Sequence, residues 1–592
     1  MLRRKKTKPA VINGEDNTSF KIAFTYFGFV FLFFVLAFRL FDLQVLKRED
    51  YKTLAENLHF TQATLIPQRG LIYVQDKDRN RVAVAINKKY FSLFVVPKEI
   101  EDPEKTSEIL AQYLPLKKEE IFQRVNKPGD PYEPLINKIE DEKLINALKE
   151  LALKGVYFKE ERFRYYPYNN FLSQTLGFIA EDKNGQIKGR YGLEAYYEEV
   201  LSGQKGEFKG PRDALGRLIR SLFSTEKKVV DGSSLVLTID KNVQSVAEEA
   251  LKELIEQREA TKGSLIVMEA KTGKIVALAN WPDFNLNEFN KVKDYSVYKN
   301  YAVQEMYEPG SVIKPLTMAA GIELGKVTPD TTYDDKGYFE VGGYKIVNYR
   351  NEVYGKNVTM WKVLERSINT GAIFVAQRVG VDNLRNYFEK FGLAEKTDID
   401  LPSEITGDLS NLKPPKVNPA YHVTASFGVG ITVTPLGLLR AFSAFANNGK
   451  LVTPYLVEGI EDTEGNYYPL DQPEPKEAIS EKTAQTLTAM LVSVIENGFG
   501  GNAKIKGYSL AGKTGTAFIP LFGKGGYSED QIHTFVGFFP AFNPRFIILV
   551  KMDRPKDTQS AASHTVTLAF KEVEQFLINY YNIPPDEVEI KR

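Results

Sequence analysis

The longest uninterrupted apolar run of the chain, IAFTYFGFVFLFFVLAF, lies at residues 22–38 and contains no charged residue. As a helix it would cover roughly 25 Å, close to the hydrocarbon thickness of a bilayer. Lys21 and Arg39 bracket the run, and their long side chains can reach the headgroups. A helix of a soluble core is rarely apolar on every face, and no small-x-small cleavage site follows. The pattern predicts one membrane anchor at residues 22–44.

Basic residues precede this run, and their position predicts its orientation. Positive charge next to a membrane span marks its cytoplasmic side. Residues 1–21 are therefore expected to be a cytoplasmic tail of a plasma-membrane protein, with everything after the span outside the cytoplasm. A nucleic-acid role for the basic run is disfavoured, because a segment of membrane length follows it directly. The basic residues are Arg3, Arg4, Lys5, Lys6 and Lys8.

From residue 45 to residue 231 the sequence is mixed and rich in charge. YFSLFVV at 90–96 is typical of a strand, and DEKLINALKELALK at 141–154 is typical of a helix. NKPGDPYEP at 126–134 carries the Pro and Gly residues of a loop. No catalytic cluster is visible in this region. We interpret residues 45–231 as a mixed α+β pedestal or dimerisation-like domain.

A different pattern begins at residue 232 and continues to residue 592. A strand is predicted at 234–239, followed by a helix at 241–259 that Asp240 can cap. Residues 264–280 have the pattern of two strands joined by a turn at Lys271-Thr272-Gly273, and helical patterns dominate residues 307–448. Strands return at 507–517 and 533–553, and a helix is predicted at 565–581. The order predicts an α/β domain whose sheet is built from both ends and flanked by helices.

Composition narrows the classes of function. A chain of 592 residues is expected to fold as two or three domains. There is no cysteine, which excludes disulfides and thiolate metal sites, and the four histidines never occur in H-E-x-x-H spacing. The net charge of +1 gives no argument for binding nucleic acid. We therefore expect no metal, no cofactor and no nucleic-acid partner.

The segment GYSLAGKTGTA at 507–517 fits two motifs that are incompatible. Its first eight residues match the phosphate-binding loop G-x-x-x-x-G-K-[ST], and Lys513-Thr514-Gly515 matches the K-T-G motif of serine enzymes that recognise penicillin. A phosphate-binding loop must open a helix, but here the Pro- and Gly-rich stretch GTAFIPLFGKGG follows. An extracytoplasmic domain also lacks a supply of ATP. The sequence favours K-T-G on a strand.

The companion motif S-x-x-K occurs five times, at Ser202, Ser224, Ser296, Ser311 and Ser410. A serine nucleophile needs its base within hydrogen-bonding reach, and residues three apart on a helix share a face. Ser311 alone begins a plausible helix, EPGSVIKPLTMAAGIELG, in which Pro315 is expected to distort the first turn and Gly325 to stop the helix. Ser202 and Ser410 lie in stretches rich in Gly or Pro, which are typical of loops. We therefore select Ser311 and Lys314.

The order Ser311-x-x-Lys314, Ser367-x-Asn369 and Lys513-Thr514-Gly515 resembles the penicillin-binding proteins and serine β-lactamases. Segments outside the site, PQRGLIY, GRYGLEAYY and RDALGR, are similar to class B penicillin-binding proteins, so the likeness extends from the anchor onwards. YEPGS and GYSLAGKTGTA resemble the septal branch more than the elongation branch. Two positions depart from the family pattern. Arg81 stands where Gly is usual in a hairpin of the pedestal. Phe518 replaces a residue that is usually polar, at the expected edge of the substrate groove.

The resemblance implies a serine penicillin-recognising transpeptidase. Ser311 would form an ester with a peptidoglycan stem peptide, and Lys314 would be its base, its pKa lowered by burial and by Lys513. Ser367 would relay a proton to the leaving D-Ala, and Asn369 would hold the amide of the donor peptide. Other roles are implied for the motif on the strand. The terminal carboxylate and the extended peptide would be bound by Lys513, Thr514, Gly515 and Thr516. The oxyanion hole would be formed by the backbone amides of Ser311 and Thr516.

Several functions stay open within this chemistry. The first is a cell-division D,D-transpeptidase that β-lactams inhibit covalently, and an elongation-type enzyme is the alternative. A β-lactamase or carboxypeptidase, or a non-catalytic β-lactam-sensing receptor, would use the same pocket. The resemblance also implies partners: stem peptides as substrates, a multi-pass membrane glycosyltransferase and other divisome proteins.

Overall fold

The computed structural model describes residues 16–50, 60–211, 225–413, 418–521 and 525–586. Contacts between residues divide the chain into two compact units. One comprises residues 1–67 and 204–230, and the other comprises residues 68–203 and 231–592. Three features discussed above lie outside the described residues: the basic residues at 3–8, Ser224, and the RDALGR segment at 212–217.

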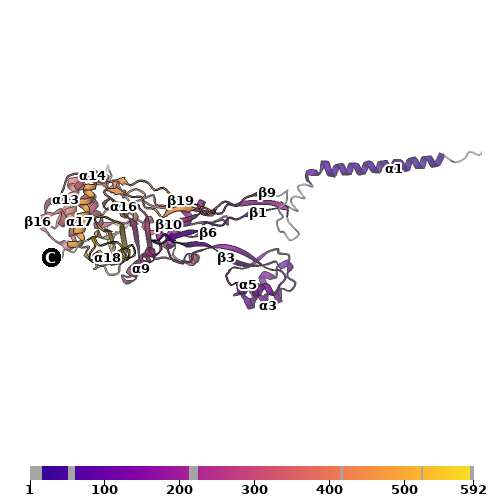
Figure 1. Cartoon of the computed structure of the whole chain (residues 1–592), viewed down its shortest axis with the longest axis horizontal. Coiled ribbons are helices and arrows are strands. Elements are labelled where there is room, and N and C mark those ends of the chain that lie inside the picture. Colours follow the sequence, from indigo (N-terminus) through magenta and orange to yellow (C-terminus); the bar gives the residue numbers. More distant parts are fainter. Residues whose placement is uncertain (1–15, 51–59, 212–224, 414–417, 522–524, 587–592) are drawn as a thin grey trace, which may run out of the picture. The chain divides into compact units, whose positions relative to one another are not determined.

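The first unit contains the predicted anchor. Helix α1 (Asp16–Phe41), drawn in indigo in Figure 1, continues into a π-helical turn at Asp42–Leu46. From Phe20 onwards its side chains are largely exposed, and the stretch Phe20–Leu46 is long and apolar enough to cross a membrane. A small antiparallel sheet completes the unit, with β8 (Gly206–Pro211) between β1 (Phe60–Leu65) and β9 (Thr225–Lys227).

The second unit contains a seven-stranded sheet that combines four strands of the pedestal region with three strands from residues 232–592. Its strand order is β19-β18-β10-β2-β3-β4, and β5 pairs with β3. Strand β10 belongs to this sheet, where it pairs in parallel with β2 and antiparallel with β18. The strands are β2 (Ile72–Gln75), β3 (Arg81–Val95), β4 (Glu133–Ile139), β5 (Val156–Tyr165), β10 (Ser234–Asp240), β18 (Val457–Glu461) and β19 (Tyr467–Pro469).

One end of β3 carries a small helical lobe with its own core. Leu93, Leu110, Ile121 and Ile145 pack together there and are almost completely buried. Helix α5 confirms the helix predicted at this place, and Asp141 caps it by accepting hydrogen bonds from the amides of the first turn. Figure 1 shows α3 and α5 beside the end of β3. The helices are α3 (Pro103–Tyr113), α4 (Lys118–Val125) and α5 (Glu142–Glu150).

The hairpin between β2 and β3 forms despite its departure from the family pattern. The Asp76 carboxylate accepts hydrogen bonds from the amides of Asp78 and Asn80, both at 2.9 Å, which closes the turn. Arg81 pairs with Gln75 across the hairpin and forms an ion pair with Glu461. Arg79 occupies a left-handed conformation (φ 64°) that glycine adopts more easily.

This turn leads to a first prediction. Arg79→Gly is expected to raise the free energy of unfolding by about 0.5–1 kcal/mol, because relief of the left-handed backbone outweighs the added freedom of the unfolded chain. Arg79→Ala removes the same side chain and keeps the strain, so it serves as the matched control. Urea unfolding followed by tryptophan fluorescence measures the difference. Equal midpoints for the two variants would show that the turn stores no backbone strain.

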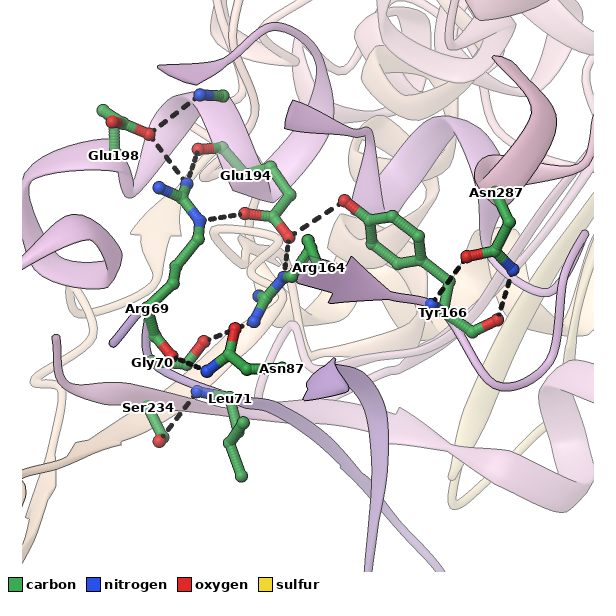
Figure 2. A network of polar contacts seen from close by, with 11 residues as sticks. Arg69, Gly70, Leu71, Asn87, Arg164, Tyr166, Glu194, Glu198, Ser234 and Asn287 are labelled. Atoms are coloured by element: carbon green, nitrogen blue, oxygen red, sulfur yellow. Dashed lines mark hydrogen bonds and ion pairs between the residues drawn. The ribbon is translucent and has the colours of Figure 1, made fainter. Parts of the chain in front are cut away.

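A buried ion-pair network joins two of the segments that carry the family resemblance (Figure 2). Arg69 of PQRGLIY and Arg164 of β5 each contact the carboxylate of Glu194, which belongs to GRYGLEAYY, at 2.6 Å. The Tyr166 hydroxyl donates to the same carboxylate at 3.2 Å, and Glu198 accepts from Arg69 at 2.7 Å. Burial raises the pKa of Glu194, but the two guanidinium groups outweigh burial, so the net shift is downward. The carboxylate is therefore charged.

A five-stranded antiparallel sheet forms the centre of the C-terminal domain, in the order β12-β11-β23-β22-β21. Two strands come from the beginning of the domain and three from its end, which confirms the prediction. Strand β11 alternates its side chains between two cores: Leu265 and Val267 face one, and Ile266 and Met268 face the other. The strands are β11 (Lys262–Glu269), β12 (Ile275–Trp281), β21 (Ala511–Pro520), β22 (Tyr527–Phe539) and β23 (Phe546–Asp553).

Helices cover both faces of this sheet. Leu251 of α9 and Phe570 of α18 pack in the same core as Val267, and Leu438 of α16 packs in the core of the other face. Asp240 caps α9 as expected. The helices are α9 (Lys241–Gln257), α11 (Lys314–Glu323), α12 (Met360–Glu365), α13 (Asn369–Val379), α14 (Val381–Lys390), α15 (Pro419–Ala425), α16 (Pro435–Ala446), α17 (Glu481–Asn497) and α18 (Val566–Tyr580).

Candidate active site

Ser311 lies in a 3₁₀ turn (Gly310–Ile313), and helix α11 begins only at Lys314. The first turn of the expected helix is therefore 3₁₀ rather than α-helical, which confirms the distortion expected from Pro315. Pro315 has no N–H group to donate to the Ser311 carbonyl, and the Lys314 amide donates to that carbonyl instead. Gly310 enters the turn with φ 59°, a conformation that disfavours other residues.

The Lys314 side chain is almost completely buried (1% exposed). Its ammonium nitrogen lies 2.8 Å from Asn369 Oδ1 and 3.2 Å from Ser367 Oγ, and it also contacts the Ser367 carbonyl. Among the described residues the Ser311 hydroxyl forms no hydrogen bond, with Lys314 or with another group. Hydrogen bonds between nucleophile and base are often long in unliganded active sites and shorten when substrate binds.

Ser367 and Asn369 follow α12, where the chain turns into α13. Ser367 has φ 52°, an uncommon conformation for serine, and its hydroxyl lies within hydrogen-bonding distance of both buried lysines. The Asn369 amide group donates to the Val347 carbonyl at 2.9 Å while its oxygen accepts from Lys314. In this structure Asn369 therefore orients Lys314 and a neighbouring loop.

Lys513 comes from strand β21 and has no exposed surface. Its Nζ donates to Ser367 Oγ and to the Thr514 carbonyl, both at 3.0 Å. Burial lowers the pKa of Lys513 to about 7. Burial, and after it the positive charge of Lys513, lowers the pKa of Lys314 well below that of an ordinary lysine. This confirms the predicted direction of the pKa shift of Lys314.

Strand β21 packs directly against the turn that carries Ser311. A Cβ atom on Gly515 would lie 2.8 Å from the Pro309 carbonyl oxygen and 3.0 Å from Val312 Cγ1. Gly428 approaches from another side: its added Cβ would lie 2.2 Å from the Gly310 carbonyl oxygen, and its own carbonyl accepts the Gly310 amide at 3.1 Å. The turn is therefore held by backbone on two sides.

A groove of about 820 Å³ opens over these residues. Ser311, Ser367 and Asn369 line it together with Thr514 and Thr516 of the strand. Lys314 and Lys513 are not among the lining residues and are fully buried. Phe518, half exposed, lines the groove, in agreement with the position expected for it at the groove edge.

The structure also identifies a residue that sequence reasoning missed. Glu308 is nearly buried; its carboxylate accepts the Gly430 amide at 3.0 Å and the Tyr527 hydroxyl at 3.0 Å. It thus ties the turn before Ser311 to the end of strand β22. The sequence signal for this role was the acidic residue directly before Pro-Gly-Ser in YEPGS. Its hydrogen-bond partners, Gly430 and Tyr527, could not be predicted because they lie 122 and 219 residues further along the chain.

Among the other S-x-x-K serines, Ser202 ends the short helix α8 (Glu198–Ser202), which differs from the expected loop. Ser296 lies in a 3₁₀ turn at Tyr295–Tyr298, and Ser410 begins a 3₁₀ turn at Ser410–Leu412. Lys314 is the lysine of these motifs that contacts Ser367 and Asn369.

The pair of buried lysines predicts how the rate of acylation by penicillin depends on pH. In the mechanism that the family resemblance implies, acylation requires neutral Lys314 to accept a proton, so the rate should fall in acid, where Lys314 gains a proton. It also requires charged Lys513 to attract the substrate carboxylate, so the rate should fall as pH rises above about 7 in the free enzyme.

Stopped-flow measurement of acylation by a fluorescent penicillin between pH 5 and 10 tests this profile, with the second-order rate constant as the readout. A rate that continues to rise up to pH 10 would indicate an ordinary lysine base and contradict the assignment.

Comparison with known proteins identifies the family of the chain. Residues 263–573 match the penicillin-binding protein transpeptidase domain, and residues 64–237 match the penicillin-binding protein dimerisation domain. Stage V sporulation protein D of Bacillus subtilis is 36% identical, over 90% of this chain and 82% of the relative. The probable peptidoglycan D,D-transpeptidase PenA of Neisseria meningitidis is 28% identical, over 99% and 98%. In fold, the chain resembles penicillin-binding protein 2X of Streptococcus thermophilus (TM-score 0.74, 24% identity, 87% of this chain and 80% of that chain).

Proposed function

This chain belongs to the class B penicillin-binding proteins, which are peptidoglycan D,D-transpeptidases, and we propose that it forms its acyl-enzyme on Ser311 and acts in cell division. The observation that carries the assignment of the site is the convergence of Lys314, Ser367, Asn369 and Lys513 through direct hydrogen bonds beneath the groove that Ser311 lines.

The first half-reaction is acylation. The Ser311 oxygen attacks the carbonyl carbon of the D-Ala-D-Ala peptide bond, and neutral Lys314 accepts the hydroxyl proton. The amides of Ser311 and Thr516 stabilise the oxyanion. The terminal carboxylate is bound by Thr514, Thr516 and the charge of Lys513. As the C–N bond breaks, the proton passes from Lys314 through Ser367 to the leaving D-Ala nitrogen, and an ester of Ser311 remains.

The second half-reaction is transfer. The amine of a neighbouring stem peptide attacks the ester carbonyl, and Lys314 accepts the proton that this amine loses. The Ser311 oxygen leaves and takes back a proton, so the enzyme returns to its starting state and an amide cross-link has formed. A β-lactam follows only the first half: its ring opens on Ser311, and the ester persists.

The placement of the chain in the cell is part of the same proposal. Residues 1–21 lie in the cytoplasm, residues 22–44 cross the plasma membrane, and the pedestal at 45–231 and the transpeptidase domain at 232–592 lie outside. Helix α1 supports this, since its apolar stretch is largely exposed from Phe20 onwards. A multi-pass membrane glycosyltransferase of the divisome supplies the glycan strands, and the anchor and pedestal bind it.

The enzymatic assignment is tested with purified full-length protein. A fluorescent penicillin should give a covalent adduct that intact mass spectrometry still detects after hours and that is absent in Ser311→Ala. A cross-linked product should form when a D-Ala-D-Ala donor and an amine acceptor are supplied. Rapid release of the adduct would indicate a β-lactamase, and a stable adduct without cross-linking would indicate a receptor. No adduct at all would overturn the function.

The cellular assignment needs a separate experiment. Depletion of this protein in the source bacterium should produce filaments without septa. Expression of the wild-type chain should restore normal division, and expression of Ser311→Ala should not. Rounded cells would assign the protein to elongation instead. A defect confined to spore formation would match the role named for the Bacillus relative.

A further inference from the structure

The residues lining the groove carry an unbalanced charge. Arg350 and Arg366 both line it, and no aspartate or glutamate does so among the residues that the structure describes. Neither guanidinium forms an ion pair or a hydrogen bond with another described residue. A third basic side chain of the groove, His564, already contacts the Ser563 hydroxyl at 2.9 Å. Two arginines without a counter-charge in a substrate groove are typical of a site for an anionic ligand.

Residues 347–351 line one side of the groove and are called the wall here. Hydrogen bonds join the wall to the segment that carries the proposed catalytic residues. The backbone of the wall begins at Val347, whose carbonyl accepts from Asn369 at 2.9 Å. The next residue, Asn348, is buried and bonds to Asp335 at 3.1 Å, and its side-chain oxygen accepts the Thr370 amide at 3.1 Å. The wall is therefore anchored at the start of α13, in the turn that presents Asn369.

Arg350 and Arg366 are presented by structured segments. Arg350 lies in a 3₁₀ turn (Tyr349–Asn351) with φ 55°, and its guanidinium lies 5.1 Å from the centre of the Tyr349 ring. Arg366 follows α12, and its backbone amide donates to the Lys362 carbonyl at 3.0 Å. Arg366 directly precedes Ser367, and Arg350 lies three residues after Val347, whose carbonyl accepts from Asn369. The planar guanidinium group of an arginine suits a carboxylate, because the carboxylate can accept two parallel hydrogen bonds from it.

On the basis of the proposed function, we propose that Arg350 and Arg366 form a subsite for an ionised carboxylate that the donor stem peptide carries upstream of its D-Ala-D-Ala end. The terminal carboxylate has its own site on strand β21, at Thr514 and Thr516. The enzyme therefore prefers donors whose upstream side-chain carboxyl is free over donors in which the same carboxyl is an amide.

The test uses two synthetic pentapeptides that end in D-Ala-D-Ala and differ only in the third residue, whose side-chain carboxyl is free in one and amidated in the other. Release of D-Ala with a D-amino-acid acceptor gives kcat/KM for each. The free acid should be favoured about 5- to 20-fold in the wild type. Arg350→Gln and Arg366→Gln should each reduce this ratio to about 2 or less, chiefly by slowing the free acid.

Matched variants separate charge from damage to the fold. Lys345→Gln removes a positive charge from the neighbouring strand β15 (Tyr344–Val347) without touching the groove, and should leave the ratio unchanged. Arg350→Lys keeps the charge and should restore part of the preference. Raising the salt concentration should lower the ratio in the wild type, because screening weakens only the charged donor.

The outcomes separate this inference from the function on which it rests. If both donors acylate Ser311 at equal rates, or if the arginine variants slow both donors equally, the subsite is wrong and the transpeptidase assignment stands. If neither donor acylates Ser311, the assignment and the subsite are both overturned.

Discussion

Replacing Lys314 with methionine is expected to lower the rate of acylation by penicillin by about 10²–10⁴, the usual contribution of a general base. Lys314 is 1% exposed and bonds to Ser367 and Asn369 at the foot of the groove. Methionine fills a similar volume, so the fold should persist. It cannot accept a proton, and the Ser311 hydroxyl would then have to attack without a base.

A time course of labelling with fluorescent penicillin measures this loss, and thermal unfolding checks that the variant is folded. Lys326→Met is the matched control, since Lys326 is an exposed lysine just beyond the end of α11. If Lys314→Met were labelled at a rate within tenfold of the wild-type rate, another group would have to be the general base for Ser311.

The second large effect concerns stability. Glu194→Gln is expected to lower the free energy of unfolding by about 3–5 kcal/mol. Glu194 has no exposed surface and holds Arg69 and Arg164 at 2.6 Å each (Figure 2). Glutamine keeps the shape and removes the charge, so two guanidinium groups would remain together in the interior. Glu198 compensates Arg69 only in part, because it is a quarter exposed and does not contact Arg164.

Thermal unfolding and urea unfolding of the purified protein measure this change. Glu199→Gln is the control: it removes an exposed carboxylate from the short helix α8, which follows the segment of Glu194, and should change stability by less than about 0.5 kcal/mol. Equal stability of the two variants would show that the network contributes no net energy to folding.

This network illustrates what the sequence can and cannot predict. PQRGLIY and GRYGLEAYY were recognised as family segments, but nothing in their spacing shows that an arginine of one meets a glutamate of the other 125 residues later. The strands and helices of the C-terminal domain follow from local periodicity and caps such as Asp240, so they were predictable.

The candidate site divides in the same way. Ser311, Lys314, Ser367, Asn369 and Lys513 were selected from ordered motifs, and the structure brings the last four together. A distorted first turn was expected from the missing amide of Pro315, and the structure shows it as a 3₁₀ turn. The contacts of this turn with β21 were not predicted, because they join segments that are distant in sequence.

Roles that depend on tertiary contacts were also missed. The bond from Asn369 to Val347, the bridge of Glu308 to Tyr527 and the unpaired arginines of the groove all join segments that are distant in sequence. Local patterns carry no information about such pairs.

The close approach of Gly428 and Gly515 to the turn that carries Ser311 restricts how bacteria could become drug-resistant through this protein. A side chain at Gly428 or Gly515 would collide with backbone and displace Ser311, so it would slow cell-wall synthesis together with inactivation by the antibiotic. Mutations that spare growth must instead accumulate where the groove wall has room, at exposed positions such as Phe518 and Tyr349. Variants selected for growth on penicillin are therefore expected to carry changes at these two aromatic residues.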